Sequence, residues 1–543
     1  MVTTGRKELT EVVPMGRGVL RFALLVAAIA ALLAMGLPMA TASTVSPPLV
    51  PVPRAQCGPG SHPELGMQGR VSAQDVADGY AAKGYTCNTQ EVGHYGTTGG
   101  YRNYRYVDAA GHVCAFYDTT LLYPTNALYG STHQTGVFVL DMSDPAHPVQ
   151  TDTLSTPAMQ SPHESLSLNL RRGLLAADLG NPLAYPGFVD VYDVSADCRH
   201  PALKSSLPMG VLGHEGTFSP DGNTFWVSSA GGGTLSAVDV SNPALPTLLW
   251  TERGIEPHGL NVSDDGNLLY IADLGNSDTT AGLTVLDVSQ VQRRASNPQV
   301  QPVTHLTWPT VSLPQVPIPV TINGHPYLAE VDEFATDGVN GGVPASDAAA
   351  HVGAARIIDN ADPAHPVVVS NIRLEVNMTE NRAAIAGDPG AGSSLQGYAG
   401  HYCAVPQRAE PGILACSFIL SGLRIFDIRD PFHPREIAYF NAPLKANPPG
   451  APQGHYAMSA PAFDLANNQI WYSDGVSGFY AVRLTLGSTT AASAGAGTAA
   501  APQTSTLPNT SSGTPRGVTA WALVVLVLAC TVPLMQRRRR MDS

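Results

Sequence analysis

Residues 136–148 read GVFVLDMSDPAHP, and similar phrases recur along the chain at roughly 45 to 70 residues, within or above the range of propeller blades. In each phrase, alternating β-branched and apolar residues predict a strand that ends at an aspartate, and an Asn/Asp-Pro turn usually follows. The other phrases are FVDVYDVSADCRHP (188–201), TLSAVDVSNPALP (234–246), GLTVLDVSQ (282–290), ARIIDNADPAHP (355–366) and GLRIFDIRDPFHP (422–434). The chain is therefore expected to be built from repeated β units.

A second pattern lies upstream of several of these strands. SPDGN (219–223) and SDDGN (263–267) each place Asp-Gly between apolar alternating segments, which is a strong hairpin signal. The two patterns together predict four strands per unit. Seven such units are expected, at about 101–159, 163–209, 213–254, 257–309, 317–377, 400–443 and 454–485.

The last unit offers only three strands before the apolar alternation stops. An open edge in a ring of blades favours aggregation, so the missing outer strand is expected from elsewhere in the chain. Residues 88–95 (NTQEVGHY) can supply it. The predicted fold is all-β: a seven-bladed β-propeller of four-stranded blades over residues 88–485, closed by an N-terminal strand.

The repeated phrase resembles the LVIVD repeat family of bacterial β-propellers, and SPDGN followed by an apolar strand resembles the YVTN-type surface propellers. The resemblance covers roughly residues 88–485 and implies the architecture. It implies little about activity, because one fold hosts many functions.

Both ends of the chain differ from this pattern. An apolar stretch at 22–37 follows basic residues, which predicts a signal peptide over 1–42, and a Pro-rich spacer is expected at 43–87. Residues 486–517 are almost uncharged and rich in Ala, Thr, Ser and Gly, which predicts a flexible stalk. A transmembrane helix at 518–536 and a basic cytoplasmic tail at 537–543 are predicted from lipid-length apolarity followed by four arginines.

The sequence Leu507-Pro508-Asn509-Thr510, with the apolar segment and basic tail behind it, resembles the cell-wall sorting signal that sortases cleave after the threonine. Ser511 stands where that family expects glycine. A plain membrane anchor is the alternative. Either interpretation predicts a bacterial cell-surface protein, anchored in the membrane or the cell wall.

Composition limits the partners. The formal net charge is −13, whereas nucleic acid would require a basic face, so we expect no nucleic-acid partner. Six cysteines precede the predicted stalk, an even number that suits disulfides in an exported protein. Cys403 and Cys416 fall on adjacent strands of one hairpin and are expected to pair, and Cys57–Cys87 with Cys114–Cys198 is the expected arrangement of the others.

Five histidines stand at the start of the first strand of five different units. The first strand of a blade is innermost, so these side chains are expected to converge at one mouth of the central channel. Imidazole is the commonest neutral metal ligand, and glutamates follow two of the histidines. The candidate metal ligands are His163, His214, His258, His401, His455, Glu164 and Glu215.

The expected metal is Cu, Zn or Mn, with open positions for water or substrate. The channel histidines also resemble those of the selenium-binding, methanethiol-oxidase propellers, which implies copper. The alternative is a repeated structural histidine that bonds a neighbouring blade's backbone. His147, His365 and His433 lie in the Asp-Pro turns and are expected to be structural.

Two functions are expected, beside the alternative of a purely structural repeat protein of the envelope. The first is a surface-anchored propeller that acts in binding or adhesion, with an extracellular small molecule, peptide or glycan as its ligand. The second is a metal-dependent extracellular enzyme, a hydrolase or oxidase, that works at the histidines. The sequence contains none of the common nucleophile or P-loop motifs that would decide between them.

Overall fold

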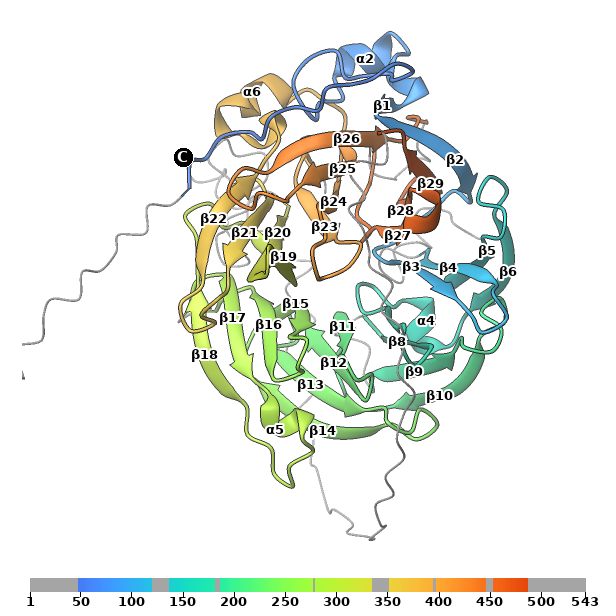
Figure 1. Cartoon of the computed structure of the whole chain (residues 1–543), viewed down its shortest axis with the longest axis vertical. Helices are drawn as coiled ribbons and strands as arrows, with labels where there is room; N and C mark the ends of the chain where they lie inside the picture. Colours follow the sequence, from blue (N-terminus) through green and yellow to red (C-terminus); the bar gives the residue numbers. More distant parts are fainter. Residues whose placement is uncertain are drawn as a thin grey trace, which may run out of the picture. The chain divides into compact units, whose positions relative to one another are not determined.

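The computed structural model describes residues 47–119, 136–180, 186–276, 279–334, 351–393, 397–445 and 453–486. Within these ranges the chain forms seven antiparallel sheets, which are arranged as blades around a central axis (Figure 1). The first strand of each blade is the innermost, and the strands follow one another outward. The predicted all-β, seven-bladed propeller is confirmed.

The first four blades follow the chain in order. Blade 1 contains β3 (Asn103–Val107), β4 (Val113–Asp118), β5 (Val137–Asp141) and β6 (Val149–Leu154). Blade 2 contains β7 (Ser167–Asn169), β8 (Leu174–Asp178), β9 (Phe188–Asp193) and β10 (Ala202–Pro208). Blade 3 contains β11 (Glu215–Phe218), β12 (Thr224–Ser229), β13 (Thr234–Asp239) and β14 (Thr247–Arg253). Blade 4 contains β15 (Pro257–Val262), β16 (Leu268–Asp273), β17 (Gly282–Asp287) and β18 (Gln301–Leu306).

Of the last three blades, blades 6 and 7 include strands from the N-terminal part of the chain. Blade 5 contains β19 (Leu313–Ile322), β20 (His325–Glu333), β21 (Ala355–Asp359) and β22 (Val367–Ile372). Blade 6 contains β23 (Gly400–Ala404), β24 (Ile413–Phe418), β25 (Gly422–Asp427) and β26 (Arg435–Asn441), with β1 (Tyr85–Cys87) as a fifth strand. Blade 7 contains β27 (Ala462–Asp464), β28 (Gln469–Asp474), β29 (Gly478–Leu484) and β2 (Thr89–Tyr95).

Strand β2 closes the ring. It pairs antiparallel with β29, from Thr89 opposite Leu484 to Tyr95 opposite Phe479. The outermost strand of blade 7 therefore comes from the start of the propeller, as was predicted for residues 88–95. This arrangement removes the open edge that three strands alone would leave.

The aspartate that ends the third strand of each of blades 1 to 6 caps the turn that follows. Asp141 Oδ1 accepts a hydrogen bond from the Ser143 amide at 2.9 Å, and Asp427 Oδ1 accepts one from the Arg429 amide at 3.1 Å. The same contact recurs at Asp193, Asp239, Asp287 and Asp359. The repeated aspartate is thus explained by turn geometry.

Apolar side chains pack between neighbouring blades. Trp226 of blade 3, which is 1% exposed, lies in one core cluster with Leu260 and Ile271 of blade 4. Alternate residues of the middle strands supply this packing on both faces, so each strand is buried almost throughout.

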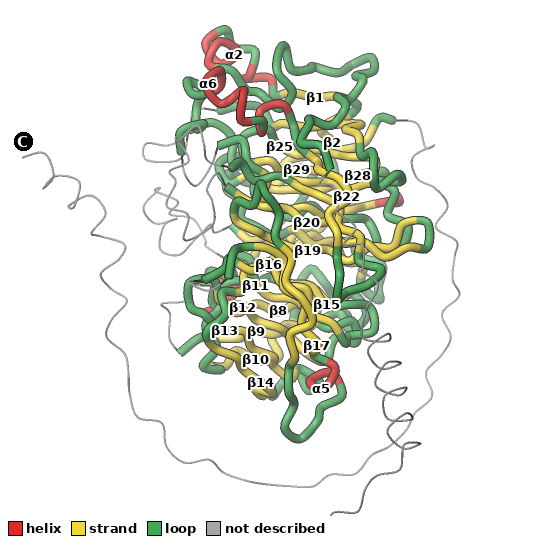
Figure 2. Tube along the Cα trace, turned by 90° about the vertical axis from the view of Figure 1, so that its left-hand side faces the viewer, coloured by secondary structure: helices red, strands yellow, loops and turns green. Residues whose placement is uncertain are grey.

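Residues 43–87 were expected to form a spacer, but the described part of this segment, together with Asn88, folds against blades 5 to 7. We call residues 47–88 the N-terminal strap. Helix α2 (Ala73–Ala77) of the strap lies beside α6 (Arg382–Ile385) in both views (Figures 1 and 2), and the Arg70 guanidinium bonds Asp388 at 2.8 Å. Buried Arg424 of β25 pairs with Glu64 of the strap and with Glu436. The short helical elements of the described residues are α4 (Pro157–Gln160), α5 (Ser289–Gln292), η1 (Ala81–Lys83), η2 (Glu375–Asn377), η3 (Thr379–Asn381) and η4 (Leu465–Asn467).

Three disulfides are present: Cys57–Cys87, Cys114–Cys198 and Cys403–Cys416, the pairs expected from the sequence. Cys57–Cys87 joins two parts of the strap, and Cys403–Cys416 joins β23 to β24. No helix within the described ranges has the length and apolar character needed to span a bilayer. The predicted signal peptide, stalk, sorting signal at Leu507–Thr510, transmembrane helix and basic tail lie outside the described residues.

Candidate metal centre

Six side chains from five blades meet at the inner edges of the sheets, and we call them the His–Glu cluster. Blades 2 to 6 contribute them from the start of a first strand or, in one case, from the end of a second strand. The members are His163 and Glu164 before β7, His214 before β11, His258 in β15, Glu333 at the end of β20, and His401 in β23.

The first part of the cluster is a compact group of three donor atoms. Nε2 of His214 lies 3.0 Å from Nε2 of His258, and Oε2 of Glu164 lies 3.1 Å from the former and 3.4 Å from the latter. His163 offers a fourth donor within 4.8 Å of Glu164 and His214. Donors that stand about 2.0 to 2.2 Å from one ion are roughly 3 to 3.5 Å apart, so this spacing suits a shared cation.

The second part lies between blades 5 and 6. Nε2 of His401 is 2.9 Å from Oε2 of Glu333 and 3.3 Å from Oε1 of Glu164. His258 connects the two parts, because its Nε2 is also 3.5 Å from Oε1 of Glu333. The side chains of His258, Glu164, Glu333 and His401 are each at most 4% exposed.

Register shifts in two of the sheets orient two of the histidines toward the cluster. The β15–β16 register shifts between Pro257 and Leu260, and the β23–β24 register shifts between Gly400 and Cys403, so His258 and His401 each lie within a shift. A bulge changes the direction of a side chain relative to regular alternation. Gly259 lets β15 approach β19, because a Cβ there would stand 1.8 Å from the Gln315 carbonyl oxygen.

Backbone carbonyls fix the orientation of both rings. Nδ1 of His258 donates to the Pro314 carbonyl at 2.7 Å, and Nδ1 of His401 donates to the Met458 carbonyl at 2.7 Å. A carbonyl can only accept, so each Nδ1 carries a proton, and each ring turns its Nε2 toward the glutamates. Metal-binding histidines are held by this kind of contact.

The close contact between His401 and Glu333 is not a hydrogen bond. Nε2 of His401 and Oε2 of Glu333 are both fully buried and have no hydrogen-bond partner among the residues that the structure describes. A buried polar atom without a hydrogen-bond partner lowers the stability of the folded state. A cation between them would satisfy both.

The electrostatics of the cluster favour an ionised Glu164 and a neutral His214, whereas His258 favours its protonated form. Burial opposes the charge of Glu164, but the charge of His163 and the nearby His214 hold its pKa well below the usual range. Burial and the charge of His163 lower the pKa of His214 to about 3. Burial on its own would lower the pKa of His258. The adjacent Glu164 and Glu333 outweigh burial and raise this pKa to about 9. A cation would compete with that last proton.

Glu215, a predicted ligand, is engaged beside the cluster instead. Its Oε1 lies 2.9 Å from Nη2 of Arg102 and accepts a hydrogen bond from the Tyr402 hydroxyl. Arg102 also stacks 4.4 Å over the Tyr402 ring and donates to the Glu164 carbonyl at 2.8 Å. Burial raises the pKa of Glu215 to about 7, although Arg102 acts in the opposite direction. Arg102 thus links the backbone of one cluster residue to a neighbouring carboxylate.

His455, the fifth predicted histidine, is bonded to the backbone before blade 7. Its Nε2 donates to the Ala442 carbonyl at 2.7 Å, and its surroundings include the charge of Asp474. The turn histidines are structural, as predicted: His365 is 82% exposed and bonds Asp362 of its own turn at 2.8 Å. His147 and His433 make the same contact.

Glu333 was missed by reasoning from the sequence. It ends the second strand of blade 5, not the first, and it precedes an insertion that interrupts the repeat, so no position in the other units is a guide to it. The available signal was the acidic pair Asp332-Glu333 at the end of an apolar strand.

Asp108, His112 and Asp197 form another group of potential ligands. Asp108 is already occupied: its Oδ1 accepts from the Ala110 and His112 amides, and its Oδ2 accepts from His112 Nδ1 and the Cys198 amide. This group stabilises a turn next to a disulfide.

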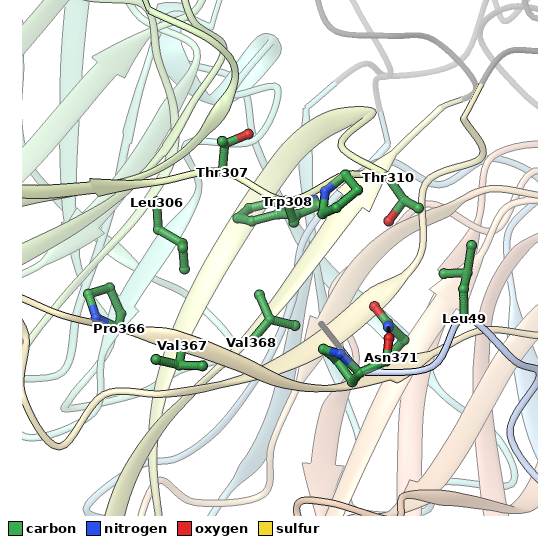
Figure 3. A pocket seen from close by; sticks show the side chains of 11 residues that line it. Leu49, Leu306, Thr307, Trp308, Thr310, Pro366, Val367, Val368 and Asn371 are labelled. Carbon is green, nitrogen blue, oxygen red and sulfur yellow. Dashed lines mark hydrogen bonds between the residues drawn. The ribbon is translucent and has the colours of Figure 1, made fainter. Parts of the chain in front are cut away.

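A separate cavity of about 250 Å³ lies between blades 4 and 5 and the strap (Figure 3). Its lining is mostly apolar, with Leu306, Trp308, Pro366 and Val368 on the blades and Leu49 on the strap. Figure 3 shows the Trp308 ring between Leu306 and Thr310, above Val368. No member of the His–Glu cluster lines it.

Residues 229–251 and 259–298 match the LVIVD repeat family. The match falls on blades 3 and 4 and agrees with the repeat seen in the sequence. No curated protein matches the chain.

Several solved structures resemble the propeller at low sequence identity. They include a putative 6-phosphogluconolactonase from Bacteroides fragilis, with TM-score 0.43 and 11% identity over 65% of this chain and 90% of that one. The periplasmic gluconolactonase PpgL from Pseudomonas aeruginosa has TM-score 0.41 and 14% identity over 64% and 91%. Hydrazine synthase from Kuenenia stuttgartiensis has TM-score 0.44 and 11% identity over 72% and 97%. Likenesses of this size carry no argument about function.

Proposed function

We propose that this protein is a metal-dependent enzyme whose transition-metal site is the His–Glu cluster. The observation that carries the proposal is the pair of Nδ1–carbonyl bonds at His258 and His401. These bonds turn the Nε2 atoms of two buried rings toward two buried carboxylates. Acceptors that face one another in the interior need a proton or a cation between them, and a borderline metal such as Cu, Zn or Mn suits imidazole with carboxylate.

The residues present can hold an ion and leave room for chemistry. His214, His258 and Glu164 occupy one face around the proposed ion, and His163 stands close enough to add a fourth bond. Two histidines and a carboxylate on one face leave positions for water or substrate. An ion held there would polarise a bound oxygen or activate water, which fits a hydrolase or an oxidase.

Metal analysis of the purified full chain tests this proposal. We expect about one or more equivalents of a transition metal per chain by mass spectrometry. His258→Asn should lower the content severalfold, because the amide can still donate to the Pro314 carbonyl but offers no Nε2. His365→Asn is the control, because His365 bonds only within its exposed turn.

The opposite outcome is equally clear. Wild-type chain without metal, even after incubation with Cu²⁺, Zn²⁺ or Mn²⁺, would identify the cluster as a network of His–Glu ion pairs and overturn the proposal.

Binding of an extracellular small molecule is the second candidate, and the cavity beside Trp308 favours it. Its apolar lining suits a small apolar ligand. Quenching of tryptophan fluorescence by such ligands, lost in Trp308→Ala, would support it; unchanged emission across apolar ligands would contradict it. Either function is proposed for the bacterial cell surface, where the predicted signal peptide and anchor would place the propeller.

A further inference from the structure

We propose that the His–Glu cluster holds two metal ions, bridged by the carboxylates of Glu164 and Glu333. This inference rests on the proposed function, because it requires that the cluster bind metal at all. It adds the number of ions and assigns the role of each glutamate.

Glu164 turns its two oxygens to different histidines. Oε2 is the oxygen close to His214 and His258, at 3.1 and 3.4 Å, whereas Oε1 is the oxygen close to His401, at 3.3 Å. A carboxylate that served one ion only would need just one of these directions. The geometry is that of a bridge.

Glu333 divides its oxygens in the same way. Oε1 lies 3.5 Å from Nε2 of His258, and Oε2 lies 2.9 Å from Nε2 of His401. The two glutamates come from blades 2 and 5, so the same division arises twice from independent parts of the fold. Each glutamate presents one oxygen to the His214–His258 side and one to the His401 side.

The donors therefore separate into two sets. The first ion would be bound by His163, His214 and His258 with one oxygen from each glutamate. The second would be bound by His401 with the other two oxygens, which is three protein donors, the number that catalytic sites keep when one position is left for water or substrate. Ions bridged in this way stand about 3.5 to 4 Å apart.

A single ion does not satisfy the group. An ion at the His214–His258 side would leave Nε2 of His401 and Oε2 of Glu333 buried without a hydrogen-bond partner in the described part of the chain. A second ion on the His401 side would bind both Nε2 of His401 and Oε2 of Glu333. It also offsets the charge of two buried carboxylates, which is costly to leave uncompensated.

Copper loading of the purified full chain tests the inference. The protein is incubated with excess Cu²⁺, loosely held ions are removed with EDTA on a sizing column, and copper is counted by mass spectrometry while unpaired spins are counted by electron paramagnetic resonance. We expect two copper ions per chain and far fewer than two spins, because bridged Cu²⁺ ions couple magnetically.

Variants separate the two positions. His401→Asn keeps a donor for the Met458 carbonyl but loses Nε2, and it should leave one copper and about one spin. Glu333→Gln, whose amide oxygen binds one ion only, should also raise the spin count per copper. His365→Asn should match wild type.

Each other outcome overturns the inference. One copper per chain in wild type would exclude the second ion and leave the proposed function standing. Two copper ions with two full, uncoupled spins would exclude the bridge. No copper would overturn both this inference and the proposed function.

Discussion

Oε2 of Glu333 lies 2.9 Å from Nε2 of His401, yet the two atoms do not form a hydrogen bond. They belong to different blades, and each is oriented by its own strand. Two buried polar atoms that lie this close without a hydrogen bond are placed to share a third partner. Most of the predictions below test the cluster that they belong to, or the backbone that aligns it.

Glu333→Ala should weaken Zn²⁺ binding by the full chain at least about tenfold, because even the loss of a residue that only orients a ligand costs 10- to 100-fold in affinity. The measurement is calorimetric titration against a competing chelator. Exposed Glu252→Ala is the matched control and should bind as wild type does. Equal affinities for the two variants would remove Glu333 from the metal site.

Gly259→Ala should lower the free energy of unfolding by roughly 1 to 3 kcal/mol, because a Cβ there would overlap the Gln315 carbonyl and push β15 from β19. The same movement would loosen the His258–Pro314 bond, so metal content should fall too. Chemical denaturation measures the first effect. Gly66→Ala is the control, since no atom lies within 4 Å of a Cβ at Gly66; a stable Gly259→Ala would show that the strands separate freely.

Asp178→Asn should stabilise the protein at pH 8. The carboxylate of Asp178 is buried without a hydrogen-bond partner among the described residues, and burial, with the charge of Glu215, raises its pKa well above the usual range. Between the unfolded pKa near 3.9 and the raised folded pKa, the native state holds a proton that the unfolded chain has lost, so stability falls as pH rises.

The neutral amide of Asp178→Asn does not lose stability as pH rises. We expect this variant to raise the free energy of unfolding by about 1 kcal/mol or more at pH 8 and to leave it unchanged at pH 4. Thermal melting across this range measures it, with exposed Asp78→Asn as the control. Parallel curves for wild type and Asp178→Asn would contradict the assigned pKa direction.

A chain that begins at Gly100 should melt well below one that begins at Pro47 and should self-associate. The shorter chain lacks β1 and β2, so blade 7 keeps three strands and exposes the edge of β29. Differential scanning fluorimetry and size-exclusion chromatography measure the two effects. Closure by β2 would be unimportant if the two chains melted together as monomers.

Much of the fold could be predicted because its signals are local. The period-two alternation, the Asp-Gly hairpins and the aspartate that caps each turn act within a few residues, so they can be read wherever they occur. Asp141 and Asp427 perform the same task in blades far apart in the chain. The N-terminal strap was taken for a spacer because its stability comes from distant partners such as Arg424, which no local pattern reveals.

The sequence by itself determined the number of blades and their order, because each depends on strands and turns encoded nearby. It also pointed to the closing strand, because the last unit lacks its outer strand and residues 88–95 form a spare one. Only the tertiary structure decided which polar side chains meet. His258 and His401 reach the cluster through register shifts and carbonyls of other blades. His455 is held by the Ala442 carbonyl, and Glu333 enters from a second strand. The physical reason is that a donor's direction depends on the packing of several blades at once, and a one-residue change in register turns a side chain to the opposite face.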